Sequence, residues 1–276
     1  MGQQGSVLVM TLALTILLVS LAGGFLYSAG VFIGNSGWEE TDAHLFWLAE
    51  AGMQKAIWNL KTPAGSGGQG ESWTTAGTTE SLGAGSYTMV AERWDFALST
   101  NGSTASATSS ASGSPASNAI DGNSATFWQS DANPSDSVPQ ELIIAFAYPL
   151  TLNKVRFVAP DSSTRPRDYS WAVSTDGSSY TTVVTVSNND ALDVTDVFSA
   201  QSNVNYIKLS TTQDGQGAPQ RVGVSTLEII GSRVTSTGTV TVSGDNYTRS
   251  VRGTVVTDDA SPQSQVAYKE PDWIEQ

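Results

Sequence analysis

The sequence predicts an α+β fold in which a long N-terminal α-helix and a small antiparallel sheet are interrupted by an inserted β-sandwich. Three observations indicate this arrangement. The first sixty residues read as continuous helix, alternating strand segments flank a long middle region, and that middle region is rich in short β-type runs. We therefore expect two folding units, the second inserted between strands of the first.

The chain opens with an uncharged apolar run from Val7 to Ile33. This run exceeds the roughly 20 residues that a membrane-spanning helix needs. No Lys or Arg precedes Lys55, which disfavours a cleavable secretory signal with its basic leading region. A plain single-pass membrane anchor remains an alternative.

From Trp38 onward the pattern becomes amphipathic, with no proline between it and the apolar run. Apolar residues recur at three- and four-residue steps, as on one face of a helix: Leu45, Leu48, Ala49, Met53, Ala56, Ile57 and Leu60. One helix over residues 6–60 would be on the order of 80 Å long. Such a rod is expected to pack against copies of itself.

The short leader ending in Gly5, the run SVLVMTLALTILLVSLAGGFL and the segment LAEAGMQKAIWNL resemble type IV pilins and pseudopilins, above all minor pilins. The resemblance implies cleavage by a prepilin peptidase between Gly5 and Ser6, and assembly with copies of itself or other pilins. Met10 stands where most pilins carry a glutamate that neutralises a neighbour's terminal amine. An unpaired amine in an apolar core is costly, which favours a minor or specialised subunit.

After Lys61 the segment PAGSGGQGESWTTAGTTE lacks periodicity and reads as a linker. GSYTMVAERW then alternates, with Tyr87, Met89 and Ala91 on one side of a predicted strand. Far downstream, SRVTSTGTVTVSGDNYTRSVRGTVV predicts two strands joined by a Ser-Gly-Asp-Asn turn. These strands would form one sheet that brackets residues 95–231.

The bracketed region carries short β-rich runs and tight-turn signals with almost no helical periodicity, which is typical of a β-sandwich. In order it contains TASATSS, SNAIDGNSATFWQS, LIIAFAYPLTLNKVRFVA, YSWAVSTDGSSYTTV, VNYIKLS and VSTLEIIG. These six segments resemble the discoidin or coagulation factor V/VIII type C domain, whose bacterial members include carbohydrate-binding modules. The resemblance implies a jelly-roll sandwich. The chain has no cysteine, so its core must suffice without disulfides.

The sequence thus predicts six segments. They are a prepilin-type leader at 1–5, the assembly helix at 6–60, a linker and first strand at 61–94, the inserted sandwich at 95–231, returning strands at 232–257 and an acidic tail at 258–276.

A candidate metal site combines Asp121 and Asn123 in the loop AIDGNSAT with Thr126 and Glu228. In discoidin-like carbohydrate modules the matching positions hold a structural calcium ion, so the resemblance implies Ca²⁺ here. Calcium takes six to eight hard oxygen ligands, which suits this set. The alternative is an Asx-type turn at Asp121 beside an exposed strand glutamate.

Ligand binding in this family uses loops at one end of the sandwich. The corresponding segments here are DANPSDSVP, PDSSTRPRDY and QDGQGAPQR. Arg165, Arg167 and Arg221 have guanidinium groups that suit forked hydrogen bonds to sugar hydroxyls or carboxylates. The alternative is that each is an ordinary solvated arginine. No loop aromatic stands out as a sugar platform, and Trp128 is expected in the core.

Composition argues against two function classes. The chain has 13 Lys and Arg against 26 Asp and Glu, a net charge of −13, which disfavours nucleic acid binding through phosphate neutralisation. The single histidine, His44, lies on the predicted helix and the chain has no cysteine, so His-dependent triads and Cys/His metal sites are effectively unavailable. We therefore expect that the protein is not an enzyme.

The sequence therefore predicts a bacterial type IV pilus-like filament subunit that displays a discoidin-like domain for adhesion or glycan binding. It would reside in the inner membrane before assembly and then in an extracellular filament or at the cell surface. One alternative is a pseudopilin of a secretion or uptake machine, with the insert as a spacer or cargo-docking surface. Another is a membrane-anchored, lectin-like protein that does not polymerise.

Overall fold

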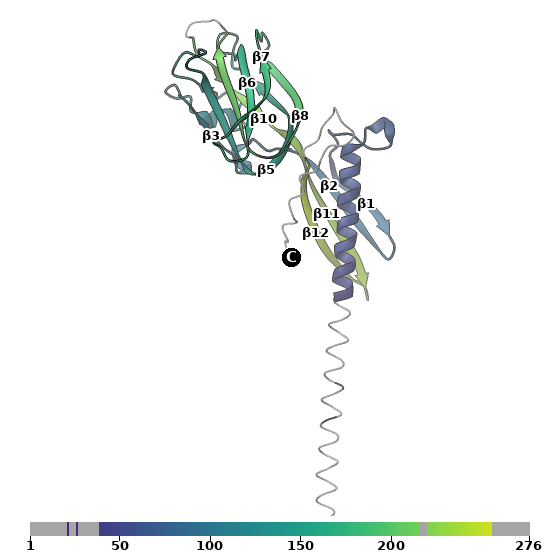
Figure 1. Cartoon of the computed structure of the whole chain (residues 1–276). Coiled ribbons are helices and arrows are strands. Elements are labelled where there is room, and N and C mark those ends of the chain that lie inside the picture. Colours follow the sequence, from purple (N-terminus) through teal and green to yellow (C-terminus); the bar gives the residue numbers. More distant parts are fainter. Residues whose placement is uncertain (1–20, 22–25, 27–38, 216–219, 256–276) are drawn as a thin grey trace, which may run out of the picture.

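The computed structural model describes residues 21, 26, 39–215 and 220–255. It contains a helix over residues 39–61, a four-stranded antiparallel sheet against that helix, and a β-sandwich at one end of the sheet (Figure 1). The chain leaves the sheet after β2 (Gly85–Asp95) and returns at β11 (Ile230–Val242), which pairs with β2. The sandwich is therefore built between two neighbouring strands of the sheet.

The helix of residues 39–61 buries its apolar stripe against the sheet. The stripe is the one that the spacing of apolar residues predicts, since a helix buries residues three and four apart on one face: Leu45, Leu48, Ala49, Met53, Ala56, Ile57 and Leu60. On the other side, Trp47 and Trp58 stay 65% and 42% exposed. The apolar face of the helix therefore covers one face of the sheet.

The sheet runs in the order β1 (Thr75–Leu82), β2, β11 and β12 (Asp245–Val255). The alternation predicted for β2 is confirmed, because Tyr87, Met89 and Ala91 all lie in the core beneath the helix. The hairpin between β11 and β12 turns at Ser243 and Gly244, whose φ angles are 55° and 96°. Two positive φ angles are typical of the tight turn that joins twisted strands.

The sandwich consists of a six-stranded sheet and a two-stranded one. The larger has the order β10-β5-β8-β6-β7 with β3 beside β5, and the smaller pairs β4 with β9. The bounds are β3 (Thr104–Ala107), β4 (Trp128–Gln129), β5 (Gln140–Val158), β6 (Asp168–Ser174), β7 (Thr181–Val186), β8 (Asp193–Gln213), β9 (Gly223–Val224) and β10 (Thr226–Glu228). Short 3-10 turns lie at η1 (Ala64–Ser66), η2 (Ser99–Asn101) and η3 (Ala116–Ile120).

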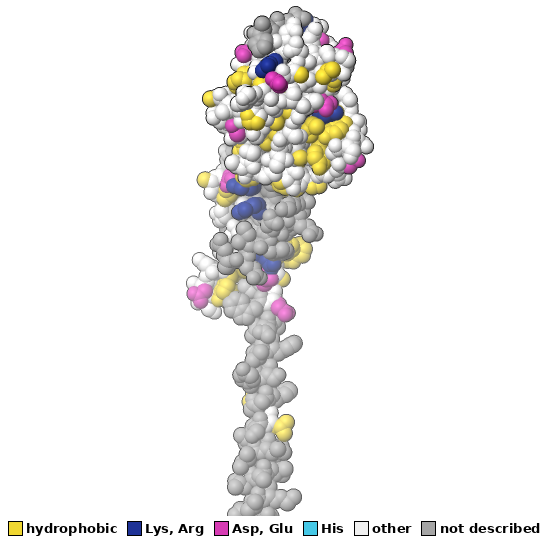
Figure 2. Space-filling view, turned by 90° about the vertical axis from the view of Figure 1, so that its left-hand side faces the viewer, with side chains coloured by type: hydrophobic (Ala, Val, Ile, Leu, Met, Phe, Trp, Pro, Cys, Tyr) yellow, Lys and Arg dark blue, Asp and Glu magenta, His cyan; other side chains and the backbone are white. Residues whose placement is uncertain are grey.

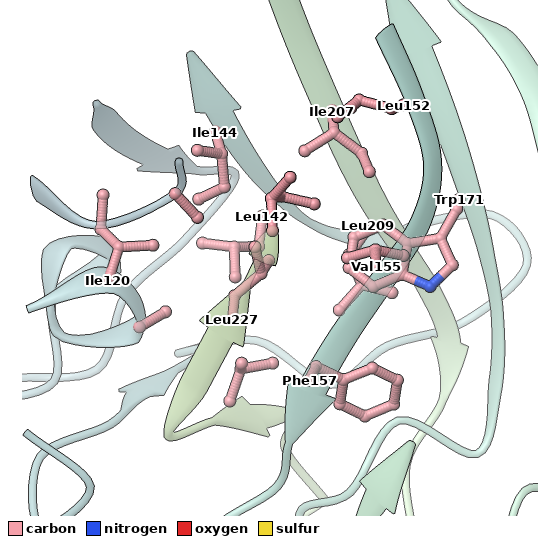
Figure 3. Packing of buried hydrophobic residues seen from close by; sticks show 14 of the residues in the cluster. Ile120, Leu142, Ile144, Leu152, Val155, Phe157, Trp171, Ile207, Leu209 and Leu227 are labelled. Atoms are coloured by element: carbon pink, nitrogen blue, oxygen red, sulfur yellow. The ribbon is translucent and has the colours of Figure 1, made fainter. Parts of the chain in front are cut away.

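One hydrophobic cluster fills the sandwich (Figure 3). The long strand β5 supplies several of its residues, and β6, β8, β10 and η3 supply others: Leu142, Ile144, Leu152, Val155, Phe157, Trp171, Ile207, Leu209, Leu227 and Ile120. Trp128 and Trp171 are fully buried, so Trp128 is a core residue, as expected. Burial of this apolar surface is the main stabilising term for a domain without disulfides.

The long strands bring distant loops together. β5 and β8 pair along almost their whole length, but their register shifts between Ala145 and Lys154, opposite residues 197–206 of β8. Such shifts bend a strand pair. Both ends of the β5–β8 pair therefore lie at the end of the sandwich remote from the helix (Figure 1). The loops next to these strand ends lie there as well.

The predicted α+β fold class is wrong. Of the residues that the structure describes, half lie in strands and 17% in helices, and the sandwich is the larger unit. The prediction gave too much weight to the helical pattern of the first sixty residues. The stripe from Leu45 to Leu60, interpreted as part of a rod that packs against copies, instead packs on a sheet of the same chain.

Part of the N-terminal prediction lies outside the described residues, including the leader and the cleavage site at Gly5 and Ser6. Within the part that the structure describes, no helix combines the length and the apolar character needed to cross a membrane.

Candidate functional site

Three loops are predicted to contact a ligand: residues 131–139, 160–169 and 213–221. The described parts of these loops, 131–139, 160–169, 213–215 and 220–221, gather at one end of the sandwich, which we call the loop end. Ser130 and Val222 exchange hydrogen bonds, with Ser130 N donating to Val222 O at 2.8 Å. Gly223 N donates to Thr164 O at 2.7 Å. Asn133 Nδ2 donates to Gln220 Oε1 at 3.2 Å. Loops far apart in the sequence therefore form one surface.

The three predicted arginines all belong to the loop end, but they differ in their contacts. Arg165 donates to the carbonyl oxygens of Asn189 and Ser162, at 3.0 and 2.6 Å, so it fastens loops together. Arg167 Nη2 donates to Asn188 Oδ1 at 2.8 Å. Arg167 has further guanidinium N–H groups besides this donor.

Arg221 forms an ion pair with Asp131 across two of the loops. Its Nη2 lies 3.1 Å from Asp131 Oδ1, and the two side chains are 30% and 64% exposed. An exposed pair of this kind adds little stability. Its charges remain accessible to a polar ligand, so Arg167 and Arg221 are better ligand-contacting candidates than Arg165.

Asp161 organises the middle loop, a role that sequence reasoning missed. Its Oδ1 accepts hydrogen bonds from the backbone and hydroxyl groups of Ser163 and Thr164, at 2.7 to 3.0 Å. Burial raises the pKa of the Asp161 carboxyl, but these hydrogen bonds outweigh it and hold the pKa below its ordinary value. The sequence signal is the Asp-Ser-Ser-Thr run, which favours an Asx-type turn.

The loop end has no exposed aromatic ring within its described residues. The one aromatic residue of the three segments, Tyr169, is 3% exposed. Its hydroxyl and Trp171 Nε1 donate to Asp196 Oδ2, at 2.9 and 2.8 Å. Burial raises the pKa of Asp196, while these two hydrogen bonds lower it. The surface is thus lined by hydrogen-bonding groups rather than by a stacking platform.

The side chains of the candidate metal loop, residues 121–126, form hydrogen bonds within the loop. Asp121 Oδ1 accepts from Asn123 N at 2.8 Å, and Asp121 Oδ2 accepts from the Thr126 hydroxyl at 2.6 Å. Asn123 Oδ1 accepts from Ala125 N at 3.1 Å. The structure therefore brings Asp121, Asn123 and Thr126 together in an Asx-type turn, which is the alternative that the sequence allowed.

Glu228 lies on β10 and pairs with a cation. Its Oε2 accepts from Arg156 Nη1, and Arg156 also donates to both carboxylate oxygens of Asp193. Glu228, Gly122 and Ser124 line one hollow of about 540 Å³. Glu228 of β10 thus borders the same hollow as two residues of the loop, whereas the hydrogen bonds of Asp121, Asn123 and Thr126 described above join residues of the loop to one another.

The donor set fits calcium in kind, since it offers carboxylate, amide, hydroxyl and carbonyl oxygens. The charge of the set fits calcium less well, because the Glu228 carboxylate is already paired with the Arg156 guanidinium. No group of three or more His, Cys, Asp or Glu side chains suited to a metal occurs within the described ranges. To bind calcium, the Glu228 carboxylate would have to leave Arg156 and coordinate the metal instead.

Sequence reasoning missed a second region, where the sandwich meets the sheet. Arg93, Lys154, Arg156 and Glu228 line a cleft there together with Glu71. These charged residues lie far apart in the sequence, so no local motif marks them. Only the insertion of the sandwich between β2 and β11 brings them together.

Residues 103–224 match the family model of the F5/8 type C domain, so the chain carries a discoidin-like domain over this range. The match does not extend to the first sixty residues, and their resemblance to pilins stays a prediction. None of the curated proteins matches the chain.

Several solved structures are similar to about half of the chain. One is CpGH89CBM32-5 from Clostridium perfringens in complex with GalNAc-beta-1,3-galactose, with 20% identity, a TM-score of 0.43, and coverage of 50% of this chain and 99% of that one. Another is the family 32 module of C. perfringens NanJ in complex with galactose, with 23% identity, a TM-score of 0.43, and coverage of 50% and 99%. A third is chitosan-binding module 1 from Paenibacillus sp. IK-5, with 28% identity, a TM-score of 0.42, and coverage of 50% and 98%.

Proposed function

We propose that this protein binds a glycan through the loop end of its F5/8 type C domain. The observation that carries the proposal is the match of residues 103–224 to this family, together with the gathering of three polar loops at one end of the domain. Members of this family in bacteria include carbohydrate-binding modules, and the loops are where the family binds its ligands.

The chemistry of the loop end supports a hydroxyl-rich ligand. Arg167 and Arg221 supply donors, Asp131 supplies acceptors, and Asn133 and Gln220 supply both. Each sugar hydroxyl both donates and accepts, so a mixed set of this kind suits a saccharide. Without an exposed ring to stack on, affinity would come from hydrogen bonds and would be modest.

A glycan array tests the proposal. The whole chain is applied beside the double variant Arg167→Ala/Arg221→Ala and the control Arg252→Ala, whose side chain lies on the sheet at 3.4 Å from the Thr235 hydroxyl. We expect a defined group of glycans to bind the wild type and the control, and at least tenfold weaker binding by the double variant, since two hydrogen bonds to charged groups are lost. No glycan binding, or equal binding by all three proteins, would contradict the proposal.

We also propose a structural calcium ion at the loop of Asp121, Asn123 and Thr126, with Glu228 as a further ligand. Binding to the folded state alone would stabilise it by about 2.7 kcal/mol when free calcium is 100 times the dissociation constant. After chelation, added Ca²⁺ should raise the melting temperature of the wild type, and Asp121→Ala should abolish the rise. An unchanged melting temperature in the wild type rejects the calcium proposal.

The finer prediction, a pilus-like filament subunit, rests on the N-terminal sequence alone. In this proposal the protein is displayed at a bacterial cell surface, binds its ligand and performs no catalysis. Mass spectrometry of the mature protein tests the assembly step: a chain that begins at Ser6 supports prepilin processing, and an intact Met1 excludes it. An intact chain would favour the membrane-anchored, lectin-like alternative.

A further inference from the structure

A cleft of about 240 Å³ lies at the junction of the sandwich and the sheet, away from the loop end. One wall is the segment of residues 71–74, which follows the helix and precedes β1. The opposite wall comes from β5 and β8 of the sandwich, and β2, β10 and β11 complete the cleft. On the face drawn in Figure 2, Lys and Arg side chains lie just below the sandwich, near this junction.

Three ion pairs fix the walls of the cleft. Lys154 Nζ donates to both carboxylate oxygens of Glu71, at 3.1 and 2.9 Å, and joins the sandwich to the segment before β1. Arg156 is held between Glu228 and Asp193. The Lys154–Glu71 side chains are only 20% and 26% exposed, so solvent screens this pair less than a surface pair. The cleft is therefore shaped before any ligand arrives.

Arg93 supplies the remaining charge of the cleft. Its side chain is exposed, and its backbone pairs with Ser232 of β11. The guanidinium forms no ion pair within 4.0 Å among the described residues, although its charge lowers the pKa of the Asp95 carboxyl. Because Lys154 and Arg156 are already held by carboxylates of Glu71, Glu228 and Asp193, the exposed guanidinium of Arg93 is the group of the cleft that is open to an anionic ligand. A guanidinium offers a planar fork of donors that matches a carboxylate.

We propose that this cleft binds a small carboxylated sugar, with the carboxylate on Arg93. The volume falls below the roughly 300 Å³ at which pockets for drug-sized molecules begin, so it suits a single sugar unit. Hydroxyl groups of Thr74, Thr195 and Ser232 line the cleft and suit the sugar hydroxyls, and Trp73 contributes an apolar surface. The site is separate from the loop end.

Titration calorimetry with glucuronic acid tests this site, with glucose and acetate as the two partial probes. We expect saturable binding of glucuronate that weakens as salt is added, because Arg93 is exposed to screening. Glucose and acetate should each bind at least tenfold more weakly, since each lacks one half of the recognised chemistry. Absence of glucuronate binding, or acetate binding of equal strength, overturns the proposal.

The variant Arg93→Gln should lose at least tenfold in affinity for glucuronate, because it removes the charged fork. Arg93→Lys keeps the charge without the fork and should be intermediate. Arg252→Gln, at an exposed arginine of the same sheet, should match the wild type. Equal affinity of Arg93→Gln and the wild type, with both melting alike, overturns the assignment. Dependence on Arg93 reports on the cleft alone, whether or not the loop end binds a glycan.

Discussion

At the scale of single residues, Asp95 ties the entry of the sandwich to its exit. Its Oδ1 accepts from Ala97 N at 2.9 Å and from Ile229 N at 3.0 Å, so one carboxylate holds the outgoing and the returning chain. Its backbone oxygen accepts from Asn101 Nδ2 at 2.7 Å. Burial raises the pKa of Asp95 to about 6; the two backbone hydrogen bonds oppose the rise, and the neighbouring charge of Glu228 adds to it.

This raised pKa predicts a pH-dependent stability. Because the folded pKa of about 6 lies above the ordinary value of 3.8, the folded protein binds more protons than the unfolded chain between these values. Asp95 should therefore destabilise the protein by about 3 kcal/mol as pH rises through this window.

The comparison with Asp95→Asn isolates this effect, because the amide oxygen keeps the two accepted hydrogen bonds. We expect urea unfolding from pH 4 to 7 to show that the variant gains stability relative to the wild type as pH rises. A free-energy difference between the two proteins that does not change with pH would contradict the assignment.

Asp196 has a comparable role inside the sandwich, since one of its oxygens accepts from both Tyr169 and Trp171. Asp196→Ala would leave a buried hydroxyl and a buried indole N–H without a partner. We expect it to lower the free energy of unfolding by about 2 kcal/mol. Asp196→Asn, which keeps an acceptor, should cost less. Denaturant unfolding of both variants measures this, and equal losses would show that the charge rather than the acceptor matters.

At the scale of elements, the helix approaches the sheet over a glycine. A Cβ atom at Gly238 of β11 would lie 2.4 Å from the backbone oxygen of Leu45 and 2.9 Å from Ala49 N. Both neighbours are backbone atoms and cannot move aside by a rotamer change. The distance between helix and sheet is therefore set by the absence of a side chain at this position.

Gly238→Ala should consequently push the helix of residues 39–61 off the sheet. We expect a loss of about 1–3 kcal/mol in the free energy of unfolding, as for other overpacked interiors. Faster amide hydrogen exchange in the helix would locate the effect. Gly65→Ala is the matched control, because a Cβ there meets nothing within 4 Å. Equal stability of the two variants would refute this packing account.

The elements also show what the sequence could reveal. β2 and the β11–β12 hairpin were predictable because they alternate along the chain and turn at Ser243 and Gly244. The loop end was predictable only through family resemblance. The cleft was not, because Arg93 and Lys154 become neighbours only when the sandwich is inserted. The helix was misjudged because an apolar stripe has the same spacing whether its partner is another copy or a sheet of the same chain.

At the scale of the whole molecule, the helix and sheet carry the sandwich at one end, and the loop end lies at the far side of the sandwich (Figure 1). The two candidate binding regions are thus separate, one at this remote end and one at the junction. The net charge of −13 repels other anionic surfaces over about a Debye length. This arrangement suits the display of a binding domain.

Hydrogen exchange of the whole chain, with and without a saccharide found on the array, tests the central claim most directly. We predict that the glycan slows amide exchange in residues 131–139, 160–169 and 213–221 and leaves the helix and the sheet unchanged. Slowed exchange confined to the helix, the sheet or the junction cleft, with none at the loop end, would contradict the claim that the F5/8 type C domain binds its glycan through these loops.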